Sequence, residues 1–143
     1  MNKIQNNILE FLNSNKVSTV CFVDAQGKPY CINCFYKFDD ESNCLIFKSS
    51  FGATHDSLIK PTSDISGTIL PDAINVLKLQ GIQFCGTLLD KTEIDAYALS
   101  TKYAKKYPMS LTMTGYVWAV KINYMKFTDN TMGFGNKTIW GNR

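Results

Sequence analysis

The chain has 143 residues, a length that fits one domain and buries about two-thirds of its unfolded surface, so folding requires neither a metal nor a disulfide. With 45% hydrophobic and 19% charged residues, the composition is that of an ordinary soluble globular protein, and the longest apolar runs are too short to span a bilayer. The net charge of +3 comes from scattered lysines, so nucleic-acid binding is not indicated.

The first residues indicate the compartment. Residues 1–7 contain no apolar segment, so no secretory signal is expected. Five cysteines, an odd number in a chain without such a signal, favour free thiols in a reducing environment. A cytoplasmic protein is therefore expected.

The first third of the chain predicts one helix and three meandering strands. Apolar residues at helical spacing predict an amphipathic helix over residues 2–13. Strands are expected over residues 16–23, 30–38 and 44–48, with polar turns at 24–27 and 39–43.

Cys31 and Cys34 form a Cys-x-x-Cys motif inside the second of these strands. Redox pairs of this kind usually open a helix, whose N-terminus stabilises the thiolate. In a strand, an offset of three residues directs the two side chains to opposite faces, so they cannot easily pair or share a metal. With one histidine and no second Cys-x-x-Cys, no metal site is expected.

The remainder of the chain predicts further strands and a second helix. Strands are expected over residues 65–70, 82–89 and 116–124, with 75–79 leading into the second of them. Gly81 and Gly86 indicate a bulge or bend of the kind that closes a barrel. A helix over residues 93–107, with a capping box at Thr92 and Asp95, is expected to cover a barrel mouth or edge. No repeat or linker interrupts the chain, so residues 1–143 form a single domain.

The C-terminal segment 126–140 carries aromatic residues at Phe127, Phe134 and Trp140 among small and amide residues. Two interpretations remain open. The segment either presents backbone and aromatic rings to a ligand or partner, or forms a strand and turn that seal the core.

The loop over residues 49–56 offers hydroxyl groups at the start of a short helical stretch. Backbone N–H groups at a helix start bind anions, and phosphate is the usual occupant. Ser49, Ser50, Thr54 and His55 would hold it. The alternative is a polar loop whose hydroxyls only cap the helix.

The side chains give little support to other kinds of catalysis. Nucleotide-binding glycine motifs, a nucleophile elbow and a suitable carboxylate pair are all missing from the sequence. An enzyme with this sequence is expected to take its chemistry from a cofactor.

Three motifs carry a resemblance to a known family. They are Asn33-Cys34-Phe35-Tyr36 with Phe38-Asp39, then Gly81-Ile82-Gln83-Phe84-x-Gly86, and Lys126-Phe127-Thr128-Asp129-Asn130-Thr131-x-Gly133-Phe134-Gly135-x-Lys137-x-Ile139-Trp140. Together they resemble the YhbP-type bacterial family within the pyridoxamine 5'-phosphate oxidase-like FMN-binding split barrels. The resemblance implies a mainly β fold with flanking helices, a six-stranded antiparallel split barrel, and a homodimer with FMN at its interface.

The resemblance also implies roles for particular residues. The phosphate of FMN would lie at Lys48, Ser49, Ser50, Thr54 and His55. The flavin ring would lie against Asn33, Cys34 and Phe35, with an amide contact from Gln83, and Phe134 and Trp140 would line the partner's flavin. The function implied is an FMN-dependent oxidoreductase acting on a small molecule. A non-catalytic flavin- or haem-binding protein, or a nucleic-acid-binding barrel, is the alternative.

Overall fold

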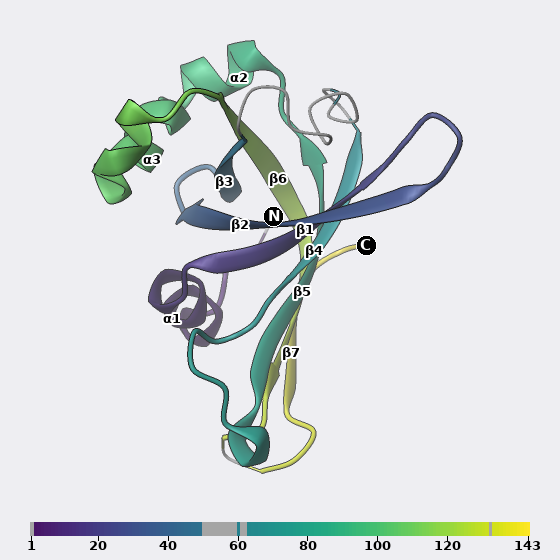
Figure 1. The fold of residues 1–143 in the computed structure, drawn as a ribbon. Helices are drawn as coiled ribbons and strands as arrows, with labels where there is room; N and C mark the ends of the chain where they lie inside the picture. Colours follow the sequence, from purple (N-terminus) through teal and green to yellow (C-terminus); the bar gives the residue numbers. More distant parts are fainter. Residues whose placement is uncertain (1, 50–59, 61–62, 132) are drawn as a thin grey trace.

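The computed structural model describes residues 2–49, 60, 63–131 and 133–143 (Figure 1). The helical elements are α1 (Asn6–Ser14), η2 (Val76–Lys78), α2 (Lys91–Ala96), α3 (Leu99–Lys106) and η3 (Pro108–Thr112). The strands are β1 (Val17–Val23), β2 (Pro29–Asp39), β3 (Cys44–Ser49), β4 (Asp64–Ile69), β5 (Gln80–Leu88), β6 (Tyr116–Asp129) and β7 (Lys137–Gly141).

The strands of the described ranges form one antiparallel sheet in the order β3-β2-β1-β4-β5-β6-β7. Because β3 also pairs with β6, the first six strands of this order close into a barrel, and β7 lies outside it as an extra strand on β6. The predicted six-stranded antiparallel barrel with few helices is therefore confirmed.

Strand β3 shows how the helices are placed on this barrel. Its side chains are buried on both faces: Leu45 and Phe47 lie in the barrel core, while Ile46 belongs to a second apolar cluster. That second cluster includes Ile94 of α2 and Leu99 of α3. The two helices thus cover the outside of the barrel beside β3, which explains why this strand is almost continuously apolar.

The first helix begins later than the sequence predicts. Helix α1 starts at Asn6 rather than at residue 2, and it buries Ile8, Phe11 and Leu12 against the barrel core. The carbonyl oxygen of Asn2 accepts a hydrogen bond from Nε1 of Trp140 at 2.7 Å. The first residues are therefore bonded to β7 instead of extending the helix.

The single helix predicted over residues 93–107 is wrong, because the chain breaks between α2 and α3. Ala98 has a left-handed backbone with φ of 53°, a conformation that costs an alanine about 1–2 kcal/mol. The break reorients the chain, and Leu99 and Tyr103 are both buried after it. The second apolar cluster compensates for the unfavourable backbone.

Two further local predictions are corrected. Oδ1 of Asp90 accepts a hydrogen bond from the backbone N–H of Glu93 at 2.9 Å, so Asp90 caps α2 in place of the predicted box at Thr92 and Asp95. Residues 76–78 form the short helix η2, rather than an extended lead into β5.

The predicted bulge is confirmed at Gly86. The register between β5 and β6 shifts between Cys85 and Gly86, which leaves Asn123 of β6 as the extra residue. At Gly81 the register is regular, so no bulge forms there. The bulge bends β6 at the place where the barrel closes.

We expect Gly86→Ala to lower the free energy of unfolding by about 2 kcal/mol, a usual cost of overpacking. A Cβ atom at Gly86 would press into the carbonyl oxygen of Lys121 and into Val120. Gly81→Ala is the matched control in the same strand, because its Cβ would have no atom nearer than 3.5 Å. Urea denaturation measures both variants. Equal stability of the two would contradict the packing argument.

Candidate functional site

A cavity of about 620 Å³ lies between β2, the end of β3, α3 and η3. Its apolar and aromatic walls are formed by Ile32, Phe35, Tyr103, Tyr107, Met109 and Met113. Its polar lining comes from Asn33, Cys34, Lys48, Ser49 and Ser110. A mostly apolar cavity of this size with a few polar groups is typical of small-molecule and cofactor sites.

Five of the residues predicted from the sequence meet in this cavity. Asn33, Cys34 and Phe35 come from β2, and Lys48 and Ser49 come from the end of β3. Ser50, Thr54 and His55, which were predicted to hold a phosphate, lie outside the described residues. The structure therefore brings together the two strand segments that the sequence assigned to one site.

The other three predicted residues lie elsewhere in this chain. Trp140 is buried in the core, 2% exposed, so its predicted position at a partner's flavin is corrected: the indole packs within its own subunit. Phe134 is 99% exposed in the connection between β6 and β7. Gln83 lines a separate hollow on the outside of β4, β5 and β6.

Lys48 fixes one wall of the cavity. Its Nζ donates to the carbonyl oxygens of Ser110 and Met113, at 2.6 Å and 2.7 Å. Both carbonyls belong to η3 or to the residue that ends it. Hydrogen bonds from a charged donor are among the stronger ones in proteins, so Lys48 ties η3 over the end of β3.

Two tyrosines of the opposite wall were missed by the sequence reasoning. The hydroxyl of Tyr103 donates to the carbonyl oxygen of Phe35 at 3.1 Å, and that of Tyr107 donates to Tyr36 at 2.6 Å. These carbonyls lie where β2 passes from pairing with β1 to pairing with β3. The spacing of four residues, which puts both rings on one side of a helix, was the available signal.

Three ionisable side chains of the cavity, Cys34, Tyr103 and Tyr107, are neutral near pH 7. Burial raises the pKa of the Cys34 thiol to about 12. Burial, and then the neighbouring phenol of Tyr107, raises the pKa of Tyr103 to about 12. Burial, and then the carboxylate of Asp72, raises the pKa of Tyr107 to about 12. Cys34 is consequently a soft, uncharged wall rather than a thiolate nucleophile.

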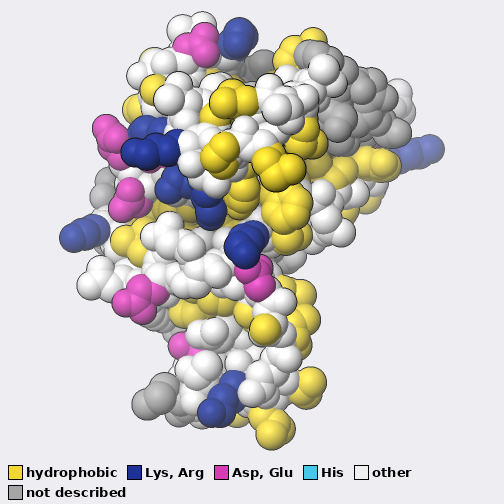
Figure 2. All heavy atoms as spheres, turned by 60° about the vertical axis from the view of Figure 1, so that its left-hand side comes forward, with side chains coloured by type: hydrophobic (Ala, Val, Ile, Leu, Met, Phe, Trp, Pro, Cys, Tyr) yellow, Lys and Arg dark blue, Asp and Glu magenta, His cyan; other side chains and the backbone are white. Residues whose placement is uncertain are grey.

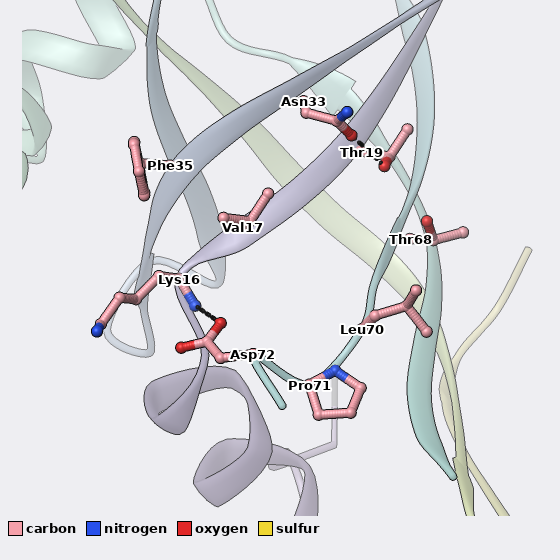
Figure 3. A pocket seen from close by; sticks show the side chains of 9 residues that line it. All are labelled: Lys16, Val17, Thr19, Asn33, Phe35, Thr68, Leu70, Pro71 and Asp72. Carbon is pink, nitrogen blue, oxygen red and sulfur yellow. Dashed lines mark hydrogen bonds between the residues drawn. The ribbon is translucent and has the colours of Figure 1, made fainter. Parts of the chain in front are cut away.

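A second cavity of about 570 Å³ adjoins the first on the outer face of β1, β2 and β4 (Figure 3). Asn33 and Phe35 line both cavities. In this second cavity Oγ1 of Thr19 donates to Oδ1 of Asn33 at 2.7 Å, which fixes the orientation of the Asn33 amide. The Asn33 amide N–H groups then point away from Thr19.

Lysines gather beside the first cavity. Figure 2 shows hydrophobic side chains next to a group of Lys and Arg side chains on this face. Lys37, Lys102, Lys105 and Lys106 line a shallow hollow with Asp39. Burial acts to raise the pKa of Asp39, but hydrogen bonds from Ser42 and Lys102 outweigh it and hold that pKa below its usual range. An anionic group near this edge of the cavity would be favoured.

Two other properties bear on the site. In the part of the chain that the structure describes, no three His, Cys, Asp or Glu side chains gather as metal ligands would. Within the same residues, none of the helices has the length and apolar character needed to cross a membrane.

Comparisons with known proteins find relatives in sequence and in fold. No protein-family model matches the chain. The chain is 29% identical over 133 residues to the UPF0306 protein YhbP of Escherichia fergusonii, which covers 93% of this chain and 90% of that protein.

Two solved structures have similar folds. One is HutZ, described as the heme storage protein of Vibrio cholerae, with a TM-score of 0.64, 13% identity, and coverage of 85% of this chain and 92% of that chain. The other is a Clostridium acetobutylicum protein related to general stress protein 26, of the pyridoxinephosphate oxidase family. It has a TM-score of 0.61, 13% identity, and coverage of 94% of this chain and 92% of that chain. These likenesses show a shared split-barrel fold.

Proposed function

We propose a function from the premise that this chain belongs to the UPF0306 (YhbP-type) family and has the split-barrel fold of pyridoxamine phosphate oxidase-like proteins. The protein binds FMN in the cavity between β2, β3, α3 and η3, and acts as an FMN-dependent oxidoreductase on a small molecule. The observation that carries the proposal is the meeting of Asn33, Cys34 and Phe35 with Lys48 and Ser49 around one cavity.

The lining of this cavity suits a flat, uncharged aromatic ring. Tyr103 and Tyr107 line the cavity with aromatic rings whose hydroxyl groups are already engaged with β2. The neutral Cys34 thiol can pack against such a ring, and the amide of Asn33 can bond to its polar edge. FMN supplies hydride or electron transfer when bound, and these residues would bind the ring and exclude water from it.

The phosphate of FMN is proposed to lie toward the end of β3. Ser49 is buried there, and its Oγ accepts a hydrogen bond from Nε1 of Trp118 at 3.0 Å. Lys48 supports this end by holding η3, and its ammonium has a third donor beyond the two bonds to carbonyls. The sequence adds Ser50, which comes next in the chain, and Thr54 and His55, which follow a few residues later.

A homodimer with FMN between its subunits is part of the proposal. Phe35, Met109 and Met113 line the cavity and are nonetheless well exposed, at 58%, 80% and 58%. Apolar surface of this kind is typical of a surface that a partner covers. A second copy could bring the exposed Phe134, or Gln83 from the outer face of β5, to the open side of the cavity.

A non-catalytic haem- or flavin-binding protein is the second candidate. Met109 and Met113 line the same cavity, and thioether sulfur is a known axial ligand of haem iron. HutZ, which shares the fold, is described as a heme storage protein. The visible spectrum of the freshly purified protein separates the candidates, because bound flavin gives a yellow absorption band and haem gives a Soret band. A protein that takes up haem and no FMN would overturn the flavin proposal.

His55 provides a direct test of the phosphate position. We expect His55→Ala to weaken FMN binding about tenfold to a hundredfold, because a charge-assisted hydrogen bond contributes about 1.5–3 kcal/mol. Titration by flavin fluorescence measures the two dissociation constants. Lys91→Ala on α2 is the control for loss of a cation, since Lys91 is almost fully exposed. Unchanged affinity in His55→Ala would remove His55 from the site, and no binding by the unmodified protein would end the flavin proposal.

A further inference from the structure

Two cysteines face each other across the hairpin formed by β1 and β2. Cys21 of β1 is the register partner of Cys31 of β2, and their Sγ atoms lie 2.6 Å apart. Cys31 is exposed and Cys21 is half-buried. Two reduced sulfur atoms this close are short of ordinary contact, and only a small movement separates them from a covalent bond.

The hairpin register places this pair at a site suited to a disulfide. The N–H of Tyr36 donates to the oxygen of Lys16, and the N–H of Asp24 donates to the oxygen of Lys28, so these two opposed pairs are hydrogen-bonded. Hydrogen-bonded and non-hydrogen-bonded pairs alternate along an antiparallel ladder, which makes Cys21 and Cys31 a non-hydrogen-bonded pair. Such pairs have Cα atoms about 4.5 Å apart, within the range of about 4.4–6.8 Å that a disulfide spans.

The other three cysteines cannot take part without backbone movement. Ser66 of β4 is the register partner of Cys21 on one side and of Cys85 of β5 on the other. Cys85 is therefore two strands from Cys21, or about 10 Å. Cys34 packs against the barrel core and Cys44 is fully buried in the second apolar cluster. The pairing is thus confined to Cys21 and Cys31.

We propose that Cys21 and Cys31 form a reversible redox modification site that exchanges with low-molecular-weight disulfides such as oxidised glutathione. The thiolate of Cys31 attacks one sulfur of the small disulfide and releases the first small thiol. Cys21 then loses its proton to water and attacks Sγ of Cys31, which displaces the second small thiol. The two cysteine thiols are oxidised to one disulfide, and one small disulfide is reduced to two thiols.

The order of attack follows from the surroundings of the two sulfurs. Burial first, and then the neighbouring Cys31, raises the pKa of Cys21 to about 11, so Cys21 is a poor first nucleophile near pH 7. Cys31 is the sulfur that a small disulfide can reach. Once Cys31 carries the mixed disulfide, the adjacent Cys21 attacks within the molecule, where proximity offsets its low thiolate fraction.

This pair is placed to affect the second cavity. Along the same face of β1 and β2, the next opposed pair after Cys21 and Cys31 is Thr19 with Asn33, which lines that cavity. A bond between the strands would fix the spacing of the neighbouring Thr19 and Asn33. The redox proposal itself does not depend on FMN binding.

The test uses the full chain, first reduced and then incubated with oxidised glutathione. After acid quenching, unfolding and alkylation, mass spectrometry counts free thiols, which should fall from five to three. Peptide mapping should find one Cys21–Cys31 link, which dithiothreitol removes. Cys85→Ser is the matched control, and it should form the same link.

Single variants separate the role of Cys31, which attacks the small disulfide, from that of Cys21, which attacks the mixed disulfide. Cys21→Ser should stop at glutathione bound to Cys31, and Cys31→Ser should form no intramolecular link. Phenylarsine oxide, which bridges two adjacent thiols, provides an independent test on the unmodified chain and should block formation of the link. Five remaining thiols after oxidation, glutathione on Cys31 without a link, or a link that involves Cys85 would overturn the proposal.

Discussion

Trp140→Ala is expected to lower the free energy of unfolding by about 4 kcal/mol, in the range known for large aromatic residues removed from a core. The indole of Trp140 is 2% exposed and belongs to the main apolar cluster. Its Nε1 also bonds to the carbonyl oxygen of Asn2, so the variant frees the N-terminal segment as well. Chemical denaturation followed by circular dichroism measures the change.

Two control variants test whether this effect comes from packing. Ile139→Ala alters the preceding residue of β7, which is more than half exposed, and should cost less than about 1 kcal/mol. Trp140→Phe keeps most of the ring and loses the hydrogen bond, so it should cost about 1–2 kcal/mol. A stable Trp140→Ala protein with weakened FMN binding would instead restore Trp140 to the cofactor site.

Cys34→Trp is expected to weaken FMN binding at least about a hundredfold, or about 2.8 kcal/mol. Cys34 lines the cavity of about 620 Å³ between β2, α3 and η3, and an indole in its place would project into the space proposed for the flavin ring. Flavin fluorescence titration measures the loss. Cys34→Ala leaves the cavity open and should keep the affinity within about threefold, or about 0.7 kcal/mol.

A variant in the opposite wall of the cavity controls for the possibility that Cys34→Trp loses FMN binding through a folding defect. Cys34 also packs against the barrel core, so an indole there adds strain of about 1–3 kcal/mol, and folding is checked first by thermal melting. Met113 is more than half exposed, so Met113→Trp can enter the cavity without disturbing the core. Tight FMN binding by both folded variants would exclude this cavity and direct attention to the one beside Val17 and Thr19.

The candidate site was predictable where it depends on strand order. Cys34 and Lys48 belong to neighbouring strands of a hairpin, and the family resemblance alone assigns both to one cofactor. Tyr103 and Tyr107 were not assigned, because their role depends on where α3 docks. That docking follows the left-handed break at Ala98, for which the alanine itself gives no local signal.

The sequence by itself determined the strands of the barrel and the turns between them, while the closure of the barrel was implied by the family resemblance. Alternating side chains, polar turns and the glycine at position 86 act over a few residues, so they can be recognised without knowing the rest of the fold. Only the tertiary structure decided which aromatic residues are buried in the core. Trp140 and Phe134 look alike in a small-residue tail, yet one is 2% and the other 99% exposed. It also decided that Cys21 is the cysteine opposite Cys31, because pairing across a hairpin depends on register and not on distance along the chain.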